Sequence, residues 1–232
     1  MLKVDDRLKA VADSIVECNV LADIGSDHGY LPIFLLQSNK IDRAIVTDIN
    51  FFPLENSKVG AEKYLVAERC DFRLGGGLEP LRENEADHIT ICGMGADTIC
   101  DILRDNLLVA KSAKMLILQP MTNQVLLAKF LGENGFEIVD VKMVRDRHLF
   151  YTIYIVKPNS NVEKEDELSL EFPKVLHEKK DNIYKEYLIY KLKIENNILS
   201  GVKKSCTEQY EIIDKAKTRI DKINKELSYY ED

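Results

Sequence analysis

A turn between residues 23 and 29 is the part of this sequence best suited to bind a ligand. The apolar residues 20–22 lead into Asp-Ile-Gly-Ser-Asp-His-Gly, and a helix-like segment follows at once. A strand that turns sharply into a helix presents backbone N–H groups and the positive helix N-terminus to a ligand. The turn therefore predicts a nucleotide-type cofactor site, although such a joint also occurs without a ligand. The candidate cofactor-binding residues here are Asp23, Gly25, Ser26 and Gly29.

Asp27 is the most discriminating residue of this turn. The spacing is similar to the first motif of S-adenosylmethionine (SAM) methyltransferases, Asp/Glu-x-Gly-x-Gly-x-Gly, with Asp27 in place of the middle glycine. A carboxylate here would repel the pyrophosphate of a dinucleotide but suits a sulfonium cofactor with a cationic amino group. Asp23 is a candidate partner for that amino group, with capping of the next helix as the alternative. Asp27 and His28 are candidate catalytic residues, although His28 would serve equally as a turn histidine bonded to backbone.

Two further strand ends supply candidate cofactor contacts. Asp48 ends the predicted strand 43–47, 23 residues after Gly25, and a carboxylate there can accept both ribose hydroxyl protons of an adenosine. Ile49 follows it. Three glycines follow the predicted strand 70–74, and Gly75 and Gly76 are candidates there. SAM enzymes often place an acidic residue at this point to bond the adenine amino group. This chain has only glycine there, so that contact must come from backbone or be absent.

The fourth and fifth predicted strands end in residues that suit a flat substrate. Cys-Gly-Met-Gly closes strand 87–92, where glycine permits close approach and Met94 can pack on a base. We expect Gly93 and Met94 to be catalytic and Cys92 and Gly93 to approach the cofactor. Gln119 follows strand 114–118 and could hydrogen-bond a base edge. The alternative for both segments is an ordinary loop without a role in binding.

The elements that must position these residues alternate along the chain. Expected helices cover residues 5–18, 30–37, 53–66, 97–108 and 123–133. Expected strands cover 20–24, 43–47, 70–74, 87–92, 114–118, 136–145 and 149–156, the last two forming an antiparallel hairpin. This order predicts an α/β fold, a Rossmann-like doubly wound sheet of seven strands, with ligands bound past the carboxyl ends of the strands.

The composition changes from residue 158 onward. Glycine almost disappears, and apolar residues recur at spacings of three and four, which predicts a helical hairpin that resembles a coiled coil. Residues 158–167 look like a linker. We therefore expect two domains, 1–157 and 158–232. The expected core stripes are Leu176, Ile183, Tyr187, Tyr190, Ile194 and Ile198, and Tyr210, Ile213, Ile220, Ile223 and Leu227.

Bulk properties narrow the class of protein. The chain has 232 residues, a net charge of −7 and five cysteines without a Cys-x-x-Cys pair, so we expect no metal site and no disulfide framework. The sequence shows no apolar leader and no apolar run of roughly 20 residues, so we expect a cytoplasmic protein without membrane contact. We also expect a monomer. The negative charge means that any RNA site must be a local patch.

Six segments together resemble the bacterial tRNA (adenine-N1)-methyltransferase family, whose members modify the adenine at tRNA position 22. The resemblance runs from about residue 5 to 157, and Gly76, Ala96 and Met121 depart from the family pattern. The segments are Asp6-Arg7-Leu8, residues 22–32, Thr47-Asp48-Ile49-Asn50, residues 74–81, residues 89–95 and Ile117-Leu118-Gln119-Pro120.

The resemblance implies methyl transfer from SAM to N1 of the adenine, and tRNA as the partner. It also implies a C-terminal helical domain, and residues 158–232 would be the tRNA-binding part. Candidate tRNA contacts are Arg7, Gln119, Arg145, Arg147, Lys203 and Lys204. The alternatives are a SAM methyltransferase for a small molecule or a protein, an NAD-dependent oxidoreductase, and a non-catalytic RNA-binding protein.

Overall fold

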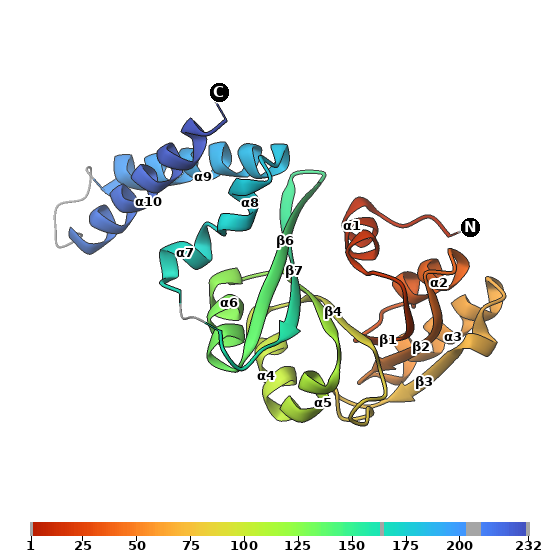
Figure 1. Ribbon diagram of the computed structural model, residues 1–232. Coiled ribbons are helices and arrows are strands. Elements are labelled where there is room, and N and C mark those ends of the chain that lie inside the picture. The colour runs from red at the N-terminus through yellow and green to blue at the C-terminus, as the bar shows by residue number, and fades with distance from the viewer. Residues whose placement is uncertain (1, 163–164, 203–209, 231–232) are drawn as a thin grey trace. The chain divides into compact units, whose positions relative to one another are not determined.

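The structure is a computed structural model that describes residues 2–162, 165–202 and 210–230 (Figure 1). The chain divides into two compact units, residues 1–170 and 171–232.

The first unit is built on one sheet of seven strands in the order β3-β2-β1-β4-β5-β7-β6. Strands β1 to β5 run parallel, and β7 pairs antiparallel with both β5 and β6. This confirms the predicted Rossmann-like seven-stranded sheet and its closing hairpin. The strands are β1 (Cys18–Ile24), β2 (Ile41–Asp48), β3 (Cys70–Leu74), β4 (His88–Met94), β5 (Met115–Pro120), β6 (Phe136–Asp146) and β7 (Leu149–Pro158).

The helices of this unit form two groups. Helices α1, α2 and α3 contact one another in sequence, and α4 contacts both α5 and α6. Figure 1 shows the two groups on different sides of the sheet, as right-handed crossovers require. The helices are α1 (Asp6–Ser14), α2 (Tyr30–Gln37), α3 (Phe51–Lys63), α4 (Ala96–Asp105), α5 (Leu107–Ser112) and α6 (Gln124–Glu133), with a 3-10 turn η1 (Ala67–Arg69) before β3.

Three predicted helices were wrong in their extent, and the one expected over residues 53–66 covers Phe51–Lys63. The helix expected over residues 5–18 ends at Ser14, because Cys18 already pairs with Ile41 at the start of β1. The helix expected over 97–108 is two helices, since Asn106 between them has φ −134° and ψ 49°, which is not helical. Spacing of apolar residues does not reveal either break, because the apolar positions continue through it.

The interior of the sheet is mostly apolar, and apart from His88 and Thr152 its buried polar residues gather near the carboxyl ends of the strands. Residues such as Leu21, Ile91 and Leu116 are fully buried. At the carboxyl ends the buried positions become polar, because Asp23, Thr47, Asp48, Thr90 and Gln119 are buried there. Burying a polar group costs free energy unless it is hydrogen-bonded, so this row of polar side chains marks the functional edge of the sheet.

The second unit contains the predicted helical hairpin. Helices α9 (Asn182–Val202) and α10 (Tyr210–Ser228) pack against each other, and α8 (Lys174–Glu178) precedes them. The short helix α7 (Glu167–Glu171) spans the boundary between the units. None of the helices in the described ranges has both the length and the apolar character needed to cross a membrane.

The buried positions of the hairpin differ in part from the predicted stripes. Tyr184, Leu188 and Ala216 are buried, together with Leu176 and Ile223 from the predicted sets. By contrast Tyr190, Ile198 and Tyr210 are exposed, which corrects their assignment to the core. Each helix has more than one apolar line at helical spacing, and only packing decides which line faces its partner.

Candidate functional site

A cleft of about 700 Å3 lies at the carboxyl ends of the first strands. The loops after β1, β2, β3 and β4 and one face of α4 line it. Six predicted site residues line this cleft, namely Gly25, Asp48, Ile49, Gly75, Gly76 and Met94. The structure thus brings together residues as far apart in the sequence as Gly25 and Met94. This is the edge at which parallel α/β sheets bind their ligands.

The turn after β1 is tied to the end of β2. The N–H groups of Gly25 and Ser26 donate to the carbonyl oxygen of Thr47 at 2.9 and 3.0 Å. Gly25 has φ +68°, and a Cβ on it would lie 2.1 Å from Cε of Met94. The positive φ favours glycine here, and the flexible end of Met94 would have to move if residue 25 carried a side chain.

Ser26 and Gly29 are not among the residues that line the cleft. Ser26 is buried, and its carbonyl oxygen accepts a 2.8 Å hydrogen bond from the hydroxyl of Ser57 on α3. Gly29 begins α2 and packs against the same serine. Both residues fix the turn against α3.

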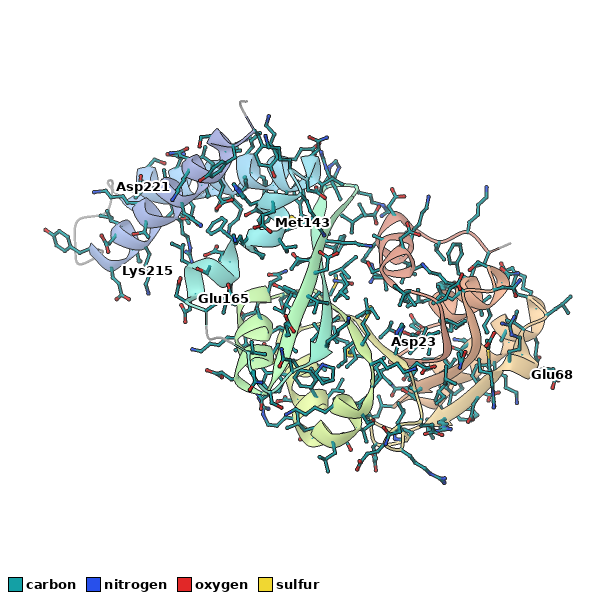
Figure 2. The ribbon with its side chains drawn as sticks, in the orientation of Figure 1. Asp23, Glu68, Met143, Glu165, Lys215 and Asp221 are labelled. Carbon is teal, nitrogen blue, oxygen red and sulfur yellow. The ribbon has the colours of Figure 1, made fainter. Side chains whose placement is uncertain are left out.

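Two aspartates end the central strands. Asp23 is buried, its Oδ1 accepts a 2.6 Å hydrogen bond from Thr90, and Figure 2 shows it inside the sheet region. Burial raises the pKa of Asp23, while hydrogen bonds from Ser26 and Thr90 oppose that rise. Asp48 lines the cleft, and its Oδ1 accepts a 2.7 Å bond from the N–H of Asn50. The bond holds the carboxylate at the edge of the cleft.

The loop after β3 is braced by Arg73. Its guanidinium donates to the carbonyl oxygen of Pro80 at 2.8 Å and forms close ion pairs with Asp71 and Glu85. The hydrogen bond from Arg73 lowers the pKa of Glu85 from 4.5 to about 2. A Cβ on Gly75 would lie 2.5 Å from Cγ of Pro80, so this residue must be glycine.

Gln119 organises the opposite side of the site, where β4 ends in a bulge. Its Oε1 accepts from Arg7 at 2.7 Å and from the N–H of Gly93 at 3.2 Å, and its Nε2 donates to the carbonyl oxygen of Pro120. Because Gln119 is fully buried, the structure places it beneath the surface, joining Arg7 to Gly93. The guanidinium of Arg7 also lies 5.9 Å from the ring centre of Tyr151.

Asp27 and His28 lie at an exposed part of the turn and do not line the cleft. Nε2 of His28 is 3.4 Å from Oδ1 of Asp27, and its ring stacks on Tyr30 at 5.3 Å. Arg145 and Arg147 are exposed at the tip of the β6–β7 hairpin. Lys203 and Lys204 lie outside the described residues.

Cys92 and Gly93, which were expected to approach the cofactor, are not among the residues that line the cleft. The Cys92 thiol lies close to the buried Asp23 and to Arg7. Burial raises the pKa of this thiol far above the ordinary value of 9.0, so the thiol stays protonated. Within the described residues, no three His, Cys, Asp or Glu side chains group as metal ligands.

Sequence reasoning missed the whole of the wall that α4 contributes. The missed lining residues of α4 share the helical spacing i, i+3, i+4 and i+7, which was the available signal: Thr98, Asp101, Ile102 and Asp105. Asn106, at the end of α4, also lines the cleft, as do Asn50, Gly77 and Glu79, each within a few residues of a predicted one.

Comparison with known proteins identifies the family. The model of a methyltransferase domain family matches residues 4–154. The Bacillus subtilis tRNA (adenine(22)-N(1))-methyltransferase is 32% identical over 169 residues, which cover 73% of this chain and 71% of that protein. This chain belongs to the tRNA (adenine(22)-N1)-methyltransferase family.

Solved structures agree with this assignment to the adenine-22 methyltransferase family. Streptococcus pneumoniae Sp1610, a putative tRNA (m1A22) methyltransferase, has a TM-score of 0.88 at 26% identity over 97% of this chain and 100% of its own. The same protein was also solved with S-adenosyl-L-methionine. M. capricolum TrmK with S-adenosyl-homocysteine has a TM-score of 0.81 at 27% identity, covering 97% of this chain and 98% of its own. The predicted family resemblance is confirmed, which favours methyl transfer over the oxidoreductase and non-catalytic alternatives.

Proposed function

We propose that this member of the family transfers the methyl group of SAM to N1 of the adenine at position 22 of tRNA. The observation that carries the proposal is the cleft that joins Gly25, Asp48 and Ile49 at one edge of the sheet. The relatives' names supply the substrate, since the matched B. subtilis protein is a tRNA (adenine(22)-N(1))-methyltransferase.

The residues of the cleft fit the cofactor. The carboxylate of Asp48 would accept hydrogen bonds from the ribose hydroxyls. Ile49, 71% exposed beside it, would cover a face of the adenine. Gly25 admits the amino acid part of the cofactor to the backbone, and Asp23 would compensate its positive amino group.

Bound SAM supplies a methyl group on a positively charged sulfur. Adenine N1 has a free lone pair when neutral, so no side chain must first remove a proton. The chain's task is to exclude water and hold the base in line, since alignment alone can supply a large part of a rate enhancement. Methylation leaves the adenine positively charged, and Asp27 would stabilise that charge.

The substrate side would be built around Gly93 and Met94. Gln119 holds Arg7 beside Gly93, so Arg7 is fixed where it can meet the nucleotide. Because N1 lies on the pairing edge, the adenine must leave its base pair to react. Strands β6 and β7 form the long hairpin seen in Figure 1. Arg145 and Arg147 at its tip would contact phosphates.

We further propose that residues 158–232 bind tRNA through its folded form and backbone, as expected for RNA recognised by shape. A tRNA substrate also fits the expected cytoplasmic location. The monomer expected from the sequence stays a prediction.

The decisive experiment incubates the full-length protein with unmodified tRNA and methyl-labelled SAM, and then maps the labelled nucleotide. We expect 1-methyladenosine at position 22 and no label in a matched tRNA with guanosine there. Label at another position, or none, contradicts the proposal. In the same assay Asp27→Asn should lower turnover while leaving SAM affinity unchanged, and unaltered turnover would remove Asp27 from the reaction.

A further inference from the structure

The loop after β3 has no acidic side chain at residue 76, which is glycine, but it brings the carboxylate of Glu79 to the same part of the cleft. Glu79 lines the cleft, and its side chain is exposed. The backbone N–H of Glu79 donates to the carbonyl oxygen of Gly76 at 3.0 Å, which folds the loop back on itself. Arg73 holds the next residue, Pro80, through its carbonyl oxygen. The carboxylate is therefore carried by a braced turn.

Gly76 lies between this carboxylate and an exposed apolar side chain. A Cβ on Gly76 would lie 3.6 Å from Cδ1 of Ile49 and 3.9 Å from Oε2 of Glu79. Ile49 directly follows Asp48, the residue suited to the ribose. One short stretch of the cleft thus offers a group for a sugar, an apolar surface for a flat ring and an acceptor beside that surface.

The other carboxylates of the cleft are less well placed for the edge of such a ring. Asp48 already accepts the N–H of Asn50, and Asp101 is paired with Arg104. Asp105 belongs to α4, whereas Ile49 and Glu79 both approach Gly76. Among the described residues, no side-chain hydrogen bond or ion pair is formed by Glu79, so its acceptor oxygens are available.

We propose that Glu79 accepts a hydrogen bond from the exocyclic amino group of the adenine of bound SAM, and so selects adenine. The inference rests on the proposed function, since it places that cofactor in this cleft. An ionised carboxylate is an acceptor only, so it pairs with the amino group of adenine and repels the carbonyl oxygen of hypoxanthine. Hydrogen bonds to charged groups are the stronger ones.

The test measures binding of two ligands by calorimetry, without any turnover. One is S-adenosylhomocysteine, and the other is its analogue with an unsubstituted purine, which lacks only the amino group. For the unaltered protein we expect roughly tenfold weaker binding of the analogue. For Glu79→Ala we expect the two ligands to bind equally, both at the level of the analogue.

Two further variants separate this role from a general effect on the cleft. Asp105→Asn removes a carboxylate from α4 and should change the affinity for both ligands by the same factor. Gly76→Asp combined with Glu79→Ala returns a carboxylate to the same place, and should restore the preference for adenine. Residue 76 can accept a side chain, because the atoms nearest to its Cβ position are at ordinary contact distances.

The outcomes are distinguishable. If the unaltered protein binds neither ligand, the proposed function fails and the inference fails with it. If it binds S-adenosylhomocysteine and Glu79→Ala keeps the same ratio between the two ligands, only the role of Glu79 is overturned. Because the side chain is exposed and forms no side-chain bond within the described residues, its removal should leave the thermal unfolding midpoint unchanged.

Discussion

At the scale of single residues, the site depends on carboxylates held in different environments. Asp23 is buried under Thr90, Asp48 is fixed by the N–H of Asn50, and Asp27 is exposed. The same side chain therefore has different hydrogen-bond partners and a different exposure to solvent at each position. Each environment leads to its own prediction.

Asp48→Ala should weaken binding of SAM by about 10- to 100-fold, because two hydrogen bonds to a charged acceptor are lost. Calorimetric titration measures the change. Asp42→Asn is the matched control, since Asp42 is an exposed aspartate at the opposite end of the same strand. Equal affinities in the Asp48 variant and the unaltered protein would exclude Asp48 from the site.

Binding of SAM should strengthen as the pH rises through the pKa of Asp23. Burial raises this pKa above its ordinary value of 3.8, so the free protein keeps a proton on this carboxyl to a higher pH than an exposed aspartate would. A cation bound beside Asp23 favours the carboxylate and lowers its pKa, so binding releases a proton. Calorimetry in buffers of different ionisation enthalpy measures that proton.

Asp23→Asn should abolish this proton release while the loop stays folded. The amide keeps an oxygen that can accept the hydrogen bond of Thr90. Proton release that persists in the variant would show that another group titrates on binding.

At the scale of elements, the loop after β3 combines glycines beside the cleft with a rigid support. Glycines 75–77 let the backbone approach the cleft, and Arg73 supplies the rigidity that the glycines lack. The ion pair between Arg73 and Glu85 closes the loop at 2.7 Å. The same short segment therefore holds both this ion pair and the proposed contacts to the cofactor.

Glu85→Gln should lower the free energy of unfolding by about 1–2 kcal/mol at pH 7, since a charge-assisted pair is lost. The pKa of Glu85 is lowered from 4.5 to about 2 in the folded protein. Its contribution is therefore present above pH 4.5 and is lost as the pH falls toward 2. Urea unfolding at pH 7 and near pH 3 should give a smaller difference at the lower pH.

The control is Glu83→Gln, which removes the same charge from an exposed neighbour. A difference between Glu85→Gln and the unaltered protein that stays constant with pH would contradict the ion pair as the cause.

At the scale of the whole molecule, the second unit has its own cluster of ion pairs. In the second unit Glu171 is 11% exposed at its side chain and accepts from Lys191 at 2.9 Å and from Arg219 at 2.8 Å. These pairs tie α7 to α9 and α10. A largely buried carboxylate between two cations is costly to remove, because Lys191 and Arg219 each lose an ion pair.

Glu171→Ala should therefore destabilise the second unit by about 3 kcal/mol. It should also reduce methylation of tRNA at low tRNA concentration while leaving the affinity for SAM unchanged. Chemical unfolding and calorimetry measure the two effects. Glu178→Ala is the control, since its pair with Lys174 is exposed and contributes little. A parallel loss of SAM affinity in the Glu171 variant would contradict independent roles for the two units.

The sequence alone determined the order of elements and the strand ends that face the cleft. Alternating apolar segments and turn glycines are local signals, and the carboxyl ends of parallel strands meet at one edge, so Gly25, Asp48 and Gly76 could be grouped without coordinates. Helix ends at Ser14 and Asn106 were not determined, because apolar spacing continues past both points.

Only the tertiary structure decided which polar side chains are exposed in the cleft and which are buried and hydrogen-bonded to other residues. Gln119 looked like a base-reading residue, yet burial and its bonds to Arg7 and Gly93 make it a support. The sequence pattern did not indicate a role for Glu79, because its position near Gly76 and Ile49 results from the packing of two loops. Burial and contacts between distant segments depend on the whole chain, so residue type and spacing cannot reveal them.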